Sequence, residues 1–218
     1  DDLMLKAKTG DWYIKKPWLA RANNSIKLLR GSFTEEEFNG YKESIKQYGD
    51  PGIVMVDDLR FCTNPCAEIG FIPINPRTGN TCWSFCNLNE INGGACTTKE
   101  KFFEACENAA ILGTLQASYT DMPFLGSDTK ELIELESLIG VSITGIMDNP
   151  QVFINAETLQ AGAKIVNETN EKIAKLIGIN PAARTTTVKP SGNASVLLQT
   201  SSGIHSAHSK KYFRIVQM

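Results

Sequence analysis

Short apolar or β-branched segments alternate with helical segments along this chain, and this alternation limits the fold more than any other feature of the sequence. Three segments bounded by glycine or proline are expected to be strands, namely Ile53–Val56, Gly140–Met147 and Arg184–Val188. The second of them is expected to be buried on both faces. Strands and helices that alternate in this order form parallel βαβ units. The sequence therefore predicts an α/β fold with an open or closed sheet.

Capping residues and glycines mark where the helices begin and end. Thr34 to Glu37 and Thr97 to Glu100 each match a capping box, which predicts a helix start at both places. The first of these helices is expected to end at Gly49 and the second to run from about Lys99 to Tyr119. The remaining helices are expected over Ser127–Leu138, over Ala156–Ile177 with Gly178 as its stop, and shortly after Pro190–Ser195.

The composition fits one α/β domain and argues against several other classes of protein. With 218 residues and 42% hydrophobic content, the chain can bury a core of its own. A net charge of −2 gives no electrostatic basis for binding nucleic acid, and no apolar run is long enough to span a membrane. Six cysteines are too sparse for a disulfide-stapled mini-domain, so a reducing, cytoplasmic setting is expected. Because the chain opens at Asp1 and stops at Met218 after an apolar run, we expect a fragment of a larger protein.

Asn64, Cys66 and Glu68 place an amide, a thiol and a carboxylate at alternating positions. In an extended segment these side chains would project from the same face, and Pro65 biases Asn64 toward that conformation. A one-sided row of this kind suits redox or radical chemistry on a polar substrate. The alternative is a polar loop that happens to contain a cysteine.

A second candidate site is the turn from Pro190 to Ser195, which lies between an expected strand and an expected helix. Such a turn offers backbone amides to an anion. Gly192 permits close approach to the backbone, and the hydroxyls of Ser191 and Ser195 add donors, so a phosphate site is expected. The alternative is an ordinary helix cap with Ser191 or Asn193 as N-cap.

The cysteines leave a third hypothesis open, a non-catalytic zinc-binding module. Its ligands would be two pairs with the same spacing: Cys62, Cys66, Cys82 and Cys86. Two observations count against zinc: the usual zinc-knuckle spacing is tighter, and Cys86 lies in an apolar context. The other cysteines and the two histidines have simpler interpretations, as packing residues (Cys96, Cys106) and as surface or polar-contact residues (His205, His208).

Five motifs in one order carry a resemblance to a known family. They are Asn64-Pro65-Cys66-Ala67-Glu68, Phe85-Cys86-Asn87-Leu88, Gly140 to Asp148, Lys189-Pro190-Ser191-Gly192 and Ser202-Gly203-Ile204-His205. Together they resemble the catalytic subunit of ribonucleotide reductase, most closely the adenosylcobalamin-dependent class II enzymes. The similarity runs from Ala22-Asn23-Asn24-Ser25 to Arg214, and it makes the zinc hypothesis much weaker.

The resemblance implies a fold and a reaction. The family fold is a ten-stranded α/β barrel with an internal finger loop that carries the radical cysteine. Residues 1–218 would form a partial catalytic barrel domain without the N-terminal half-barrel, the effector site and the C-terminal tail. The reaction would be thiyl-radical reduction of ribonucleotides to 2′-deoxyribonucleotides, with adenosylcobalamin as cofactor and a thioredoxin-like reductant. The segment from Tyr212 to Gln217 resembles triphosphate reductases, and a diphosphate-level reductase is the alternative.

The resemblance also implies roles for individual residues. Cys66 would be the thiyl, Glu68 the base at the 3′ hydroxyl, and Asn64 a hydrogen-bonding partner of the ribose hydroxyls. Cys86 would be one of two redox-active cysteines, and its partner would lie outside this chain. The substrate phosphate would be held by Ser191, Gly192, Asn193 and Ala194. Two residues depart from the family pattern, Asn193 where threonine is frequent and Cys62 where glycine is expected.

The partners follow from the same resemblance. They are a ribonucleotide substrate, the reductant and a nucleotide effector bound by the missing region. Because a fragment would leave an open sheet edge, it is expected to be inactive alone and to associate with itself or with a complementing chain.

Overall fold

The computed structural model describes residues 5–209, 211, 213 and 215. The chain divides into two compact units, Asp1–Pro73 and Ile74–Met218. In the described residues, no helix has the length and apolar character needed to cross a membrane. The sequence-based expectation for Tyr212 to Gln217 falls mainly outside the described residues.

The first unit is built around one parallel strand pair. β1 (Ser25–Leu29) pairs with β2 (Gly52–Val56), and α3 (Glu35–Tyr48) connects them. Alternate apolar residues of these strands are buried, among them Ile26, Leu28 and Val56. This is a parallel βαβ unit, the kind of unit predicted from the sequence, although β1 itself was not predicted. Two short helices precede it, α2 (Trp12–Lys15) and the 3₁₀ helix η1 (Pro17–Arg21).

The ends of α3 have the predicted chemistry. The Thr34 side chain accepts a hydrogen bond from the Glu37 amide, and the Glu37 carboxylate accepts one from the Thr34 amide at 2.7 Å. The hydrogen bond from the Thr34 amide, and after it the one from the Thr34 hydroxyl, lower the pKa of the Glu37 carboxyl. Gly49 ends the helix in the left-handed conformation, with φ of 75°.

The second unit holds another parallel pair. β5 (Asn87–Asn92) pairs with β6 (Ile139–Thr144), and α4 (Lys99–Ala117) and α5 (Gly126–Glu136) lie between them in the chain. β6 is followed by α7 (Ala156–Ile177), whose bounds match the prediction, and by α8 (Asn193–Leu197). The shorter helices are η2 (Pro123–Leu125), η3 (Ile146–Asp148) and α6 (Pro150–Phe153).

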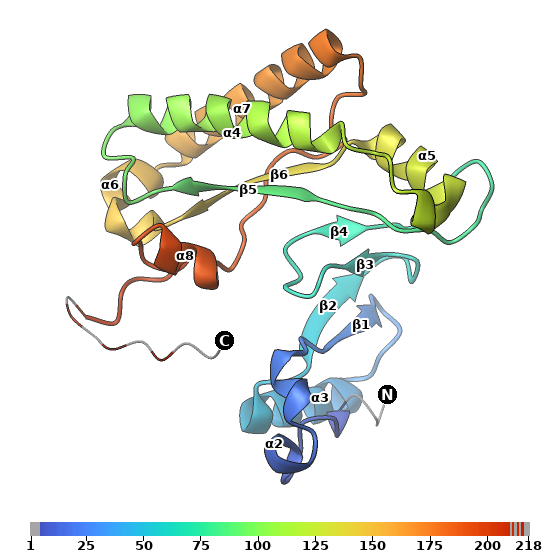
Figure 1. Cartoon of the computed structure of the whole chain (residues 1–218). Coiled ribbons are helices and arrows are strands. Elements are labelled where there is room, and N and C mark those ends of the chain that lie inside the picture. Colours follow the sequence, from blue (N-terminus) through green and yellow to red (C-terminus); the bar gives the residue numbers. More distant parts are fainter. Residues whose placement is uncertain (1–4, 210, 212, 214, 216–218) are drawn as a thin grey trace. The chain divides into compact units, whose positions relative to one another are not determined.

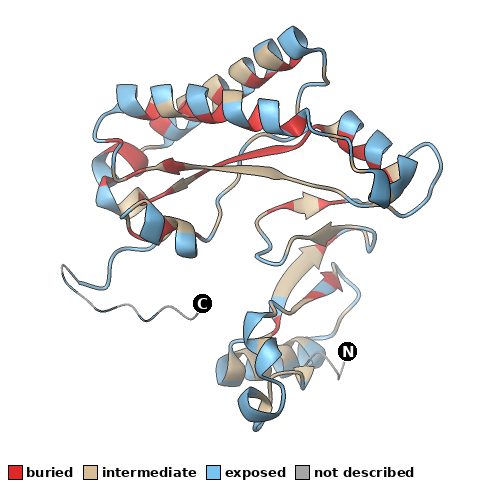
Figure 2. Ribbon diagram, in the orientation of Figure 1, coloured by how far each residue is buried: buried red, intermediate tan, exposed pale blue. Residues whose placement is uncertain are grey.

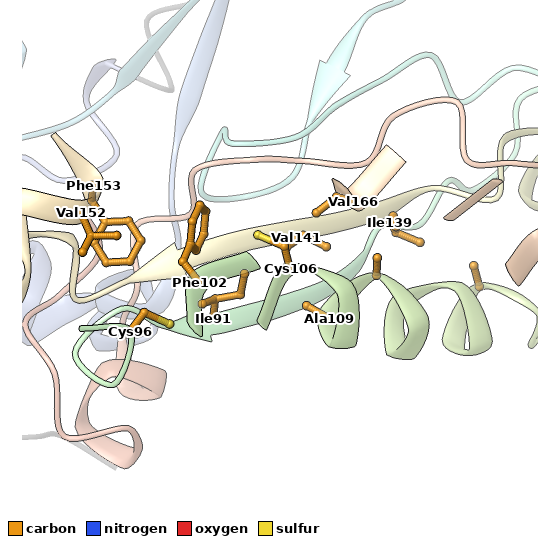
Figure 3. Close-up of a cluster of buried hydrophobic side chains, with 12 residues drawn as sticks. Ile91, Cys96, Phe102, Cys106, Ala109, Ile139, Val141, Val152, Phe153 and Val166 are labelled. Atoms are coloured by element: carbon orange, nitrogen blue, oxygen red, sulfur yellow. The ribbon is translucent and has the colours of Figure 1, made fainter. Parts of the chain in front are cut away.

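One face of the β5–β6 pair is apolar. α4 and α7 lie together over this face, whereas α8 lies on the other side of the strands (Figure 1). The strands contribute Ile91, Ile139 and Val141 to a buried cluster with Phe102 of α4 and Val166 of α7 (Figure 3). β6 is buried along most of its length (Figure 2), as predicted for a strand covered on both faces.

The other face of the same pair is polar. Strand periodicity places Glu90 and Asn92 of β5, and Ser142 and Thr144 of β6, on this face. Ser142 and Thr144 are both fully buried, with 0% exposure. The segment from Lys189 to Gly203 is anchored on this face: the Lys189 amide donates to the Ser142 hydroxyl, and the Thr144 hydroxyl donates to the Ser201 carbonyl and accepts from the Gly203 amide.

Two sequence-based expectations need correction. Arg184–Val188 is not a strand: it runs beside β6 through a single parallel bridge, Val141 to Thr186. The capping box predicted at Thr97 is wrong by one residue, since Thr98 is the N-cap and accepts from the Lys101 amide. With lysine at that position, no carboxylate can complete the box.

Candidate functional site

Asn64 to Glu68 form the turn of a hairpin rather than an extended row. β3 (Cys62–Thr63) pairs with β4 (Gly70–Phe71) in antiparallel fashion, and the motif connects them. The Ala67 amide donates to the Asn64 carbonyl at 2.9 Å, and the Asn64 amide donates to the Ile69 carbonyl at 3.2 Å. Ala67 has φ of 62°, which reverses the chain. The expected alternation is therefore wrong, because it assumed continuous extended backbone.

The turn presents the thiol to solvent. Cys66 is exposed, and Glu68 two residues later is half-buried. The Asn64 side-chain oxygen accepts from the Ile69 amide at 3.2 Å, and the side chain keeps its NH₂ group as a donor. The three predicted residues thus share one short turn, and the only exposed side chain of the three is the thiol of Cys66.

A polar pocket of about 310 Å³ lies beside this turn. It is lined by residues of the β3–β4 hairpin, of β1 and β2, and of the segment before β1: Asn23, Ser25, Lys27, Val54, Cys62, Thr63, Asn64 and Pro65. Asn23 also approaches the thiol, with its side-chain nitrogen 3.7 Å from the sulfur of Cys66. Sequence reasoning gave no role to Asn23, which lies 43 residues away from Cys66 in the chain.

The two serine hydroxyls of the predicted phosphate turn donate hydrogen bonds to acceptors within the protein. Ser191, only 4% exposed, donates to the Glu90 carboxylate at 3.0 Å. Ser195, fully buried, donates to the Gly192 carbonyl at 2.9 Å. Because a hydroxyl has one hydrogen to donate, neither serine serves a phosphate as the donor that the sequence suggested.

The backbone of the same turn is open. α8 begins at Asn193 with Gly192 as N-cap, so the alternative with Ser191 or Asn193 as N-cap is wrong. The first amides of a helix have no intrahelical acceptor. Gly192 and Asn193 are exposed, and a Cβ added at Gly192 would have no atom within 4 Å. The exposed backbone of this turn is thus at Gly192 and Asn193, whereas Ala194 is partly buried.

Cys86 precedes β5, on the same face of the strand as Glu90 by strand periodicity. A Cβ added at Gly140 would lie 2.7 Å from the Cys86 sulfur, so this sulfur packs against the backbone of β6. At about 3.3 Å per residue, Cys86 and Glu90 are roughly 13 Å apart along the strand. Since Glu90 holds Ser191, the sulfur and the phosphate turn lie over one face of the second unit.

The predicted site residues are thus divided between the two units. Asn64, Cys66 and Glu68 belong to the first, whereas Cys86 and the turn from Ser191 to Ala194 belong to the second.

Three of the remaining cysteines lie in environments that raise the pKa of the thiol. Cys96 and Cys106 are buried in the hydrophobic core, as predicted. Burial raises the pKa of Cys106 to about 12 and also raises the pKa of Cys96. For Cys82, burial and then the nearby Asp128 carboxylate raise the thiol pKa. The six cysteines, all within the described residues, form no disulfide with one another.

The zinc hypothesis gains no support from the geometry. Across the described part of the chain, no group of three or more His, Cys, Asp or Glu side chains is placed to hold a metal ion. The two cysteine pairs belong to different units. His205 and His208 are both exposed, in agreement with the surface interpretation.

The fold defines the class of protein that this chain resembles. The crystal structure of a B12-dependent, class II ribonucleotide reductase superposes with a TM-score of 0.67 at 21% identity. The match covers 94% of this chain and 32% of the reductase chain. The α/β fold class predicted from the sequence is therefore confirmed.

The sequence is homologous to particular members of that class. It is 24% identical over 213 residues to the "Probable adenosylcobalamin-dependent ribonucleoside-triphosphate reductase" of Dictyostelium discoideum, covering 90% of this chain and 26% of that protein. It is 27% identical over 233 residues to the adenosylcobalamin-dependent ribonucleoside-triphosphate reductase of Lactobacillus acidophilus, covering 84% and 29% respectively. No protein-family model matches the chain. The resemblance read from the motifs is thus confirmed, and the chain spans less than a third of the length of these curated relatives.

Proposed function

We propose that this chain is part of the catalytic barrel of an adenosylcobalamin-dependent ribonucleotide reductase. The observation that carries the proposal is the exposed thiol of Cys66 in the β3–β4 turn, flanked by Asn64 and Glu68, in a chain homologous to such reductases. Residues 1–218 would form one partial domain, with both units in a ten-stranded α/β barrel. The β3–β4 hairpin would be the tip of the finger loop inside that barrel.

Cys66 is proposed to start and end the reaction on the substrate. As a thiyl radical it takes the hydrogen atom from the 3′ carbon of the ribose and later returns it. Glu68 accepts the proton of the 3′ hydroxyl, and the side-chain NH₂ of Asn64 hydrogen-bonds the ribose hydroxyls. An exposed thiol suits this role, because the sulfur must contact the radical source that removes its hydrogen atom. Adenosylcobalamin, when bound, supplies the radical.

The electrons for the reduction are proposed to come from two thiols, Cys86 and a partner outside this chain. The 2′ hydroxyl leaves as water, the carbon gains a hydrogen, and the two thiols become a disulfide. A thioredoxin-like reductant then restores the thiols. Such chemistry requires reduced cysteines, which suits a cytoplasmic protein.

The phosphate of the substrate is proposed to bind the amides of Gly192, Asn193 and Ala194, with the Ser191 oxygen nearby. Each hydrogen bond to a charged phosphate oxygen contributes on the order of 1.5–3 kcal/mol, so a few such amides can anchor a nucleotide. The names of the relatives support the triphosphate level over the diphosphate level. A nucleotide effector and a complementing chain are proposed to act through parts of the barrel outside these residues.

The decisive experiment compares Cys66→Ser with Cys82→Ser in the complete protein that carries this sequence. Cys66→Ser should reduce ribonucleotide turnover to background while nucleotide affinity stays within about twofold, because only the hydrogen-atom donor is lost. Cys82→Ser should keep turnover, since Cys82 has no role in the proposed chemistry. Wild-type turnover by Cys66→Ser would refute the proposal. Stoichiometric zinc held by Cys62, Cys66, Cys82 and Cys86 would favour the binding module instead.

A further inference from the structure

Glu90 is a carboxylate in the middle of β5, on the polar face of the strand pair. One of its oxygens, Oε2, accepts the hydrogen bond from the Ser191 hydroxyl at 3.0 Å. The other, Oε1, is buried without a hydrogen-bond partner among the residues that the structure describes. The two residues are 101 positions apart in the chain, so this contact joins the sheet to the start of the phosphate turn.

Ser191 is held at both of its polar ends. Its hydroxyl donates to Glu90, and its carbonyl accepts from the Ser202 hydroxyl. Two residues earlier, the Lys189 amide donates to the Ser142 side chain at 2.9 Å. Glu90 and Ser142 are direct partners in the β5–β6 register. Neighbouring positions of the two strands therefore fix the chain just before its exposed amides begin.

The charge of Glu90 opposes the ligand that we propose for this turn. A carboxylate beneath a phosphate site repels the anion, and the repulsion is larger where water is excluded. The negative charge of Glu90 by itself would therefore weaken phosphate binding at this turn. Its favourable contribution is the acceptor that it gives to a buried hydroxyl, which would otherwise lose its partner.

We infer that Glu90 is a positioning residue for the phosphate turn. Its carboxylate oxygen holds Ser191 in one conformation, and this directs the following amides of Gly192 and Asn193 away from the sheet and toward the ligand. The inference rests on the proposed function and deepens it. Two properties of the Glu90 side chain then have opposite effects: the hydrogen-bond acceptor supports anion binding, and the negative charge weakens it.

Two variants of Glu90 separate these properties. Glu90→Gln keeps an acceptor oxygen for Ser191 and removes the charge. Glu90→Leu removes both the acceptor and the charge at similar volume. Glu107, an exposed carboxylate in α4, provides the matched controls Glu107→Gln and Glu107→Leu. Circular dichroism and thermal unfolding of all four variants would check that the second unit remains folded.

The first measurement is hydrogen exchange of the amides from Ser191 to Ala194 in the whole chain. Glu90→Leu should raise their exchange rates by about tenfold, because a buried hydroxyl loses its acceptor. Glu90→Gln and both Glu107 variants should stay within about threefold of the wild type. This readout depends on the contact alone and needs no ligand.

The second measurement is the affinity for inorganic pyrophosphate by calorimetry. Glu90→Leu should weaken binding about tenfold, whereas Glu90→Gln should bind as tightly as the wild type or more tightly. Unchanged exchange and affinity in Glu90→Leu would overturn the inference and leave the proposed function intact. Equal losses in Glu90→Gln and Glu90→Leu would also overturn it, since the charge would then be the useful property. Failure of the wild type to bind pyrophosphate would refute the phosphate site itself, and the inference with it.

Discussion

The sulfur of Cys86 occupies the space that a side chain at residue 140 would need. A Cβ added to Gly140 would lie 2.7 Å from that sulfur and 2.8 Å from a methyl carbon of Leu88. Both distances are shorter than van der Waals contact allows, so the glycine on β6 makes room for the thiol at the start of β5. This relationship gives a structural reason for the glycine that begins the motif from Gly140 to Asp148.

Gly140→Ala should therefore destabilise the chain and displace Cys86. Overpacking of this kind costs about 1–3 kcal/mol of the free energy of unfolding. The alkylation rate of Cys86 should change with it, which mass spectrometry of the labelled peptides would measure. Gly40→Ala is the control: Gly40 lies within α3 with no atom within 4 Å of an added Cβ, so alanine should stabilise by about 1 kcal/mol. Equal stability of both variants would show that Gly140 is not tightly packed.

The cysteines should react with iodoacetamide in a defined order at pH 8. Cys66 should react first because it is exposed in the hairpin turn. Cys106 should react last in the folded chain, since burial raises the pKa of its thiol to about 12 and only the thiolate is reactive. Cys96 and Cys82, whose pKa values are also raised, should fall between them. Time-resolved peptide mapping checks the order, and early labelling of Cys106 would contradict the packing of the core.

Asn170→Ala should destabilise the second unit by about 1–3 kcal/mol. The Asn170 side chain, 2% exposed in α7, donates to the Thr114 hydroxyl of α4 at 2.8 Å. It also accepts from the Ala182 amide at 2.8 Å, so both groups lose a partner in the variant. Chemical unfolding measures the change. Asn167→Ala, at an exposed position of the same helix, removes a solvent-exposed hydrogen bond from the Thr185 hydroxyl and should cost less than about 0.5 kcal/mol, so equal losses would argue against a special role for Asn170.

Asp128→Asn should destabilise the chain at neutral pH and lose this effect in acid. Hydrogen bonds from Thr78, then Asn80 and Asn75, lower the pKa of the Asp128 carboxyl below its ordinary value of 3.8. A lowered folded-state pKa stabilises the protein above the unfolded-state pKa, and this contribution disappears as pH falls through the folded-state value. Urea unfolding at pH 7, 5 and 3 should show a difference that shrinks toward pH 3.

Exposed Asp121 provides the matched control for that series, as Asp121→Asn. A constant difference between Asp128→Asn and the wild type at all three pH values would mean that ionisation of Asp128 does not stabilise the loop from Asn75 to Asn80.

Local signals were sufficient to predict the longer helices and the α/β fold class. Thr34 and Glu37 form the capping box, and α7 has the predicted bounds because Gly178 adopts the left-handed conformation that ends it. β5 was missed because its inward-facing residues, such as Glu90 and Asn92, are polar and hide the strand periodicity. When the polar residues of a strand anchor a loop, the sequence does not distinguish them from the polar residues of the loop itself.

The candidate site could be predicted only in part, for two physical reasons. The turn at Asn64 to Glu68 depends on a left-handed Ala67, a conformation that alanine rarely adopts and its sequence does not signal. Glu90 and Asn23 contact Ser191 and Cys66 across 101 and 43 residues of chain, and no motif spans such separations. The sequence indicated the chemistry of single residues, but only the folded structure identifies their long-range contacts.

The unequal faces of the β5–β6 pair also protect the chain against mispairing. A slip of β5 by one residue would turn Glu90 toward Phe102 in the apolar cluster and would turn Ile91 toward the loop. Burying that carboxylate without partners would cost several kcal/mol, while the loop would lose the acceptor for Ser191. A mispaired strand is therefore penalised on both of its sides at once, so the residues that anchor the loop also ensure that the two strands meet in one alignment as the protein folds.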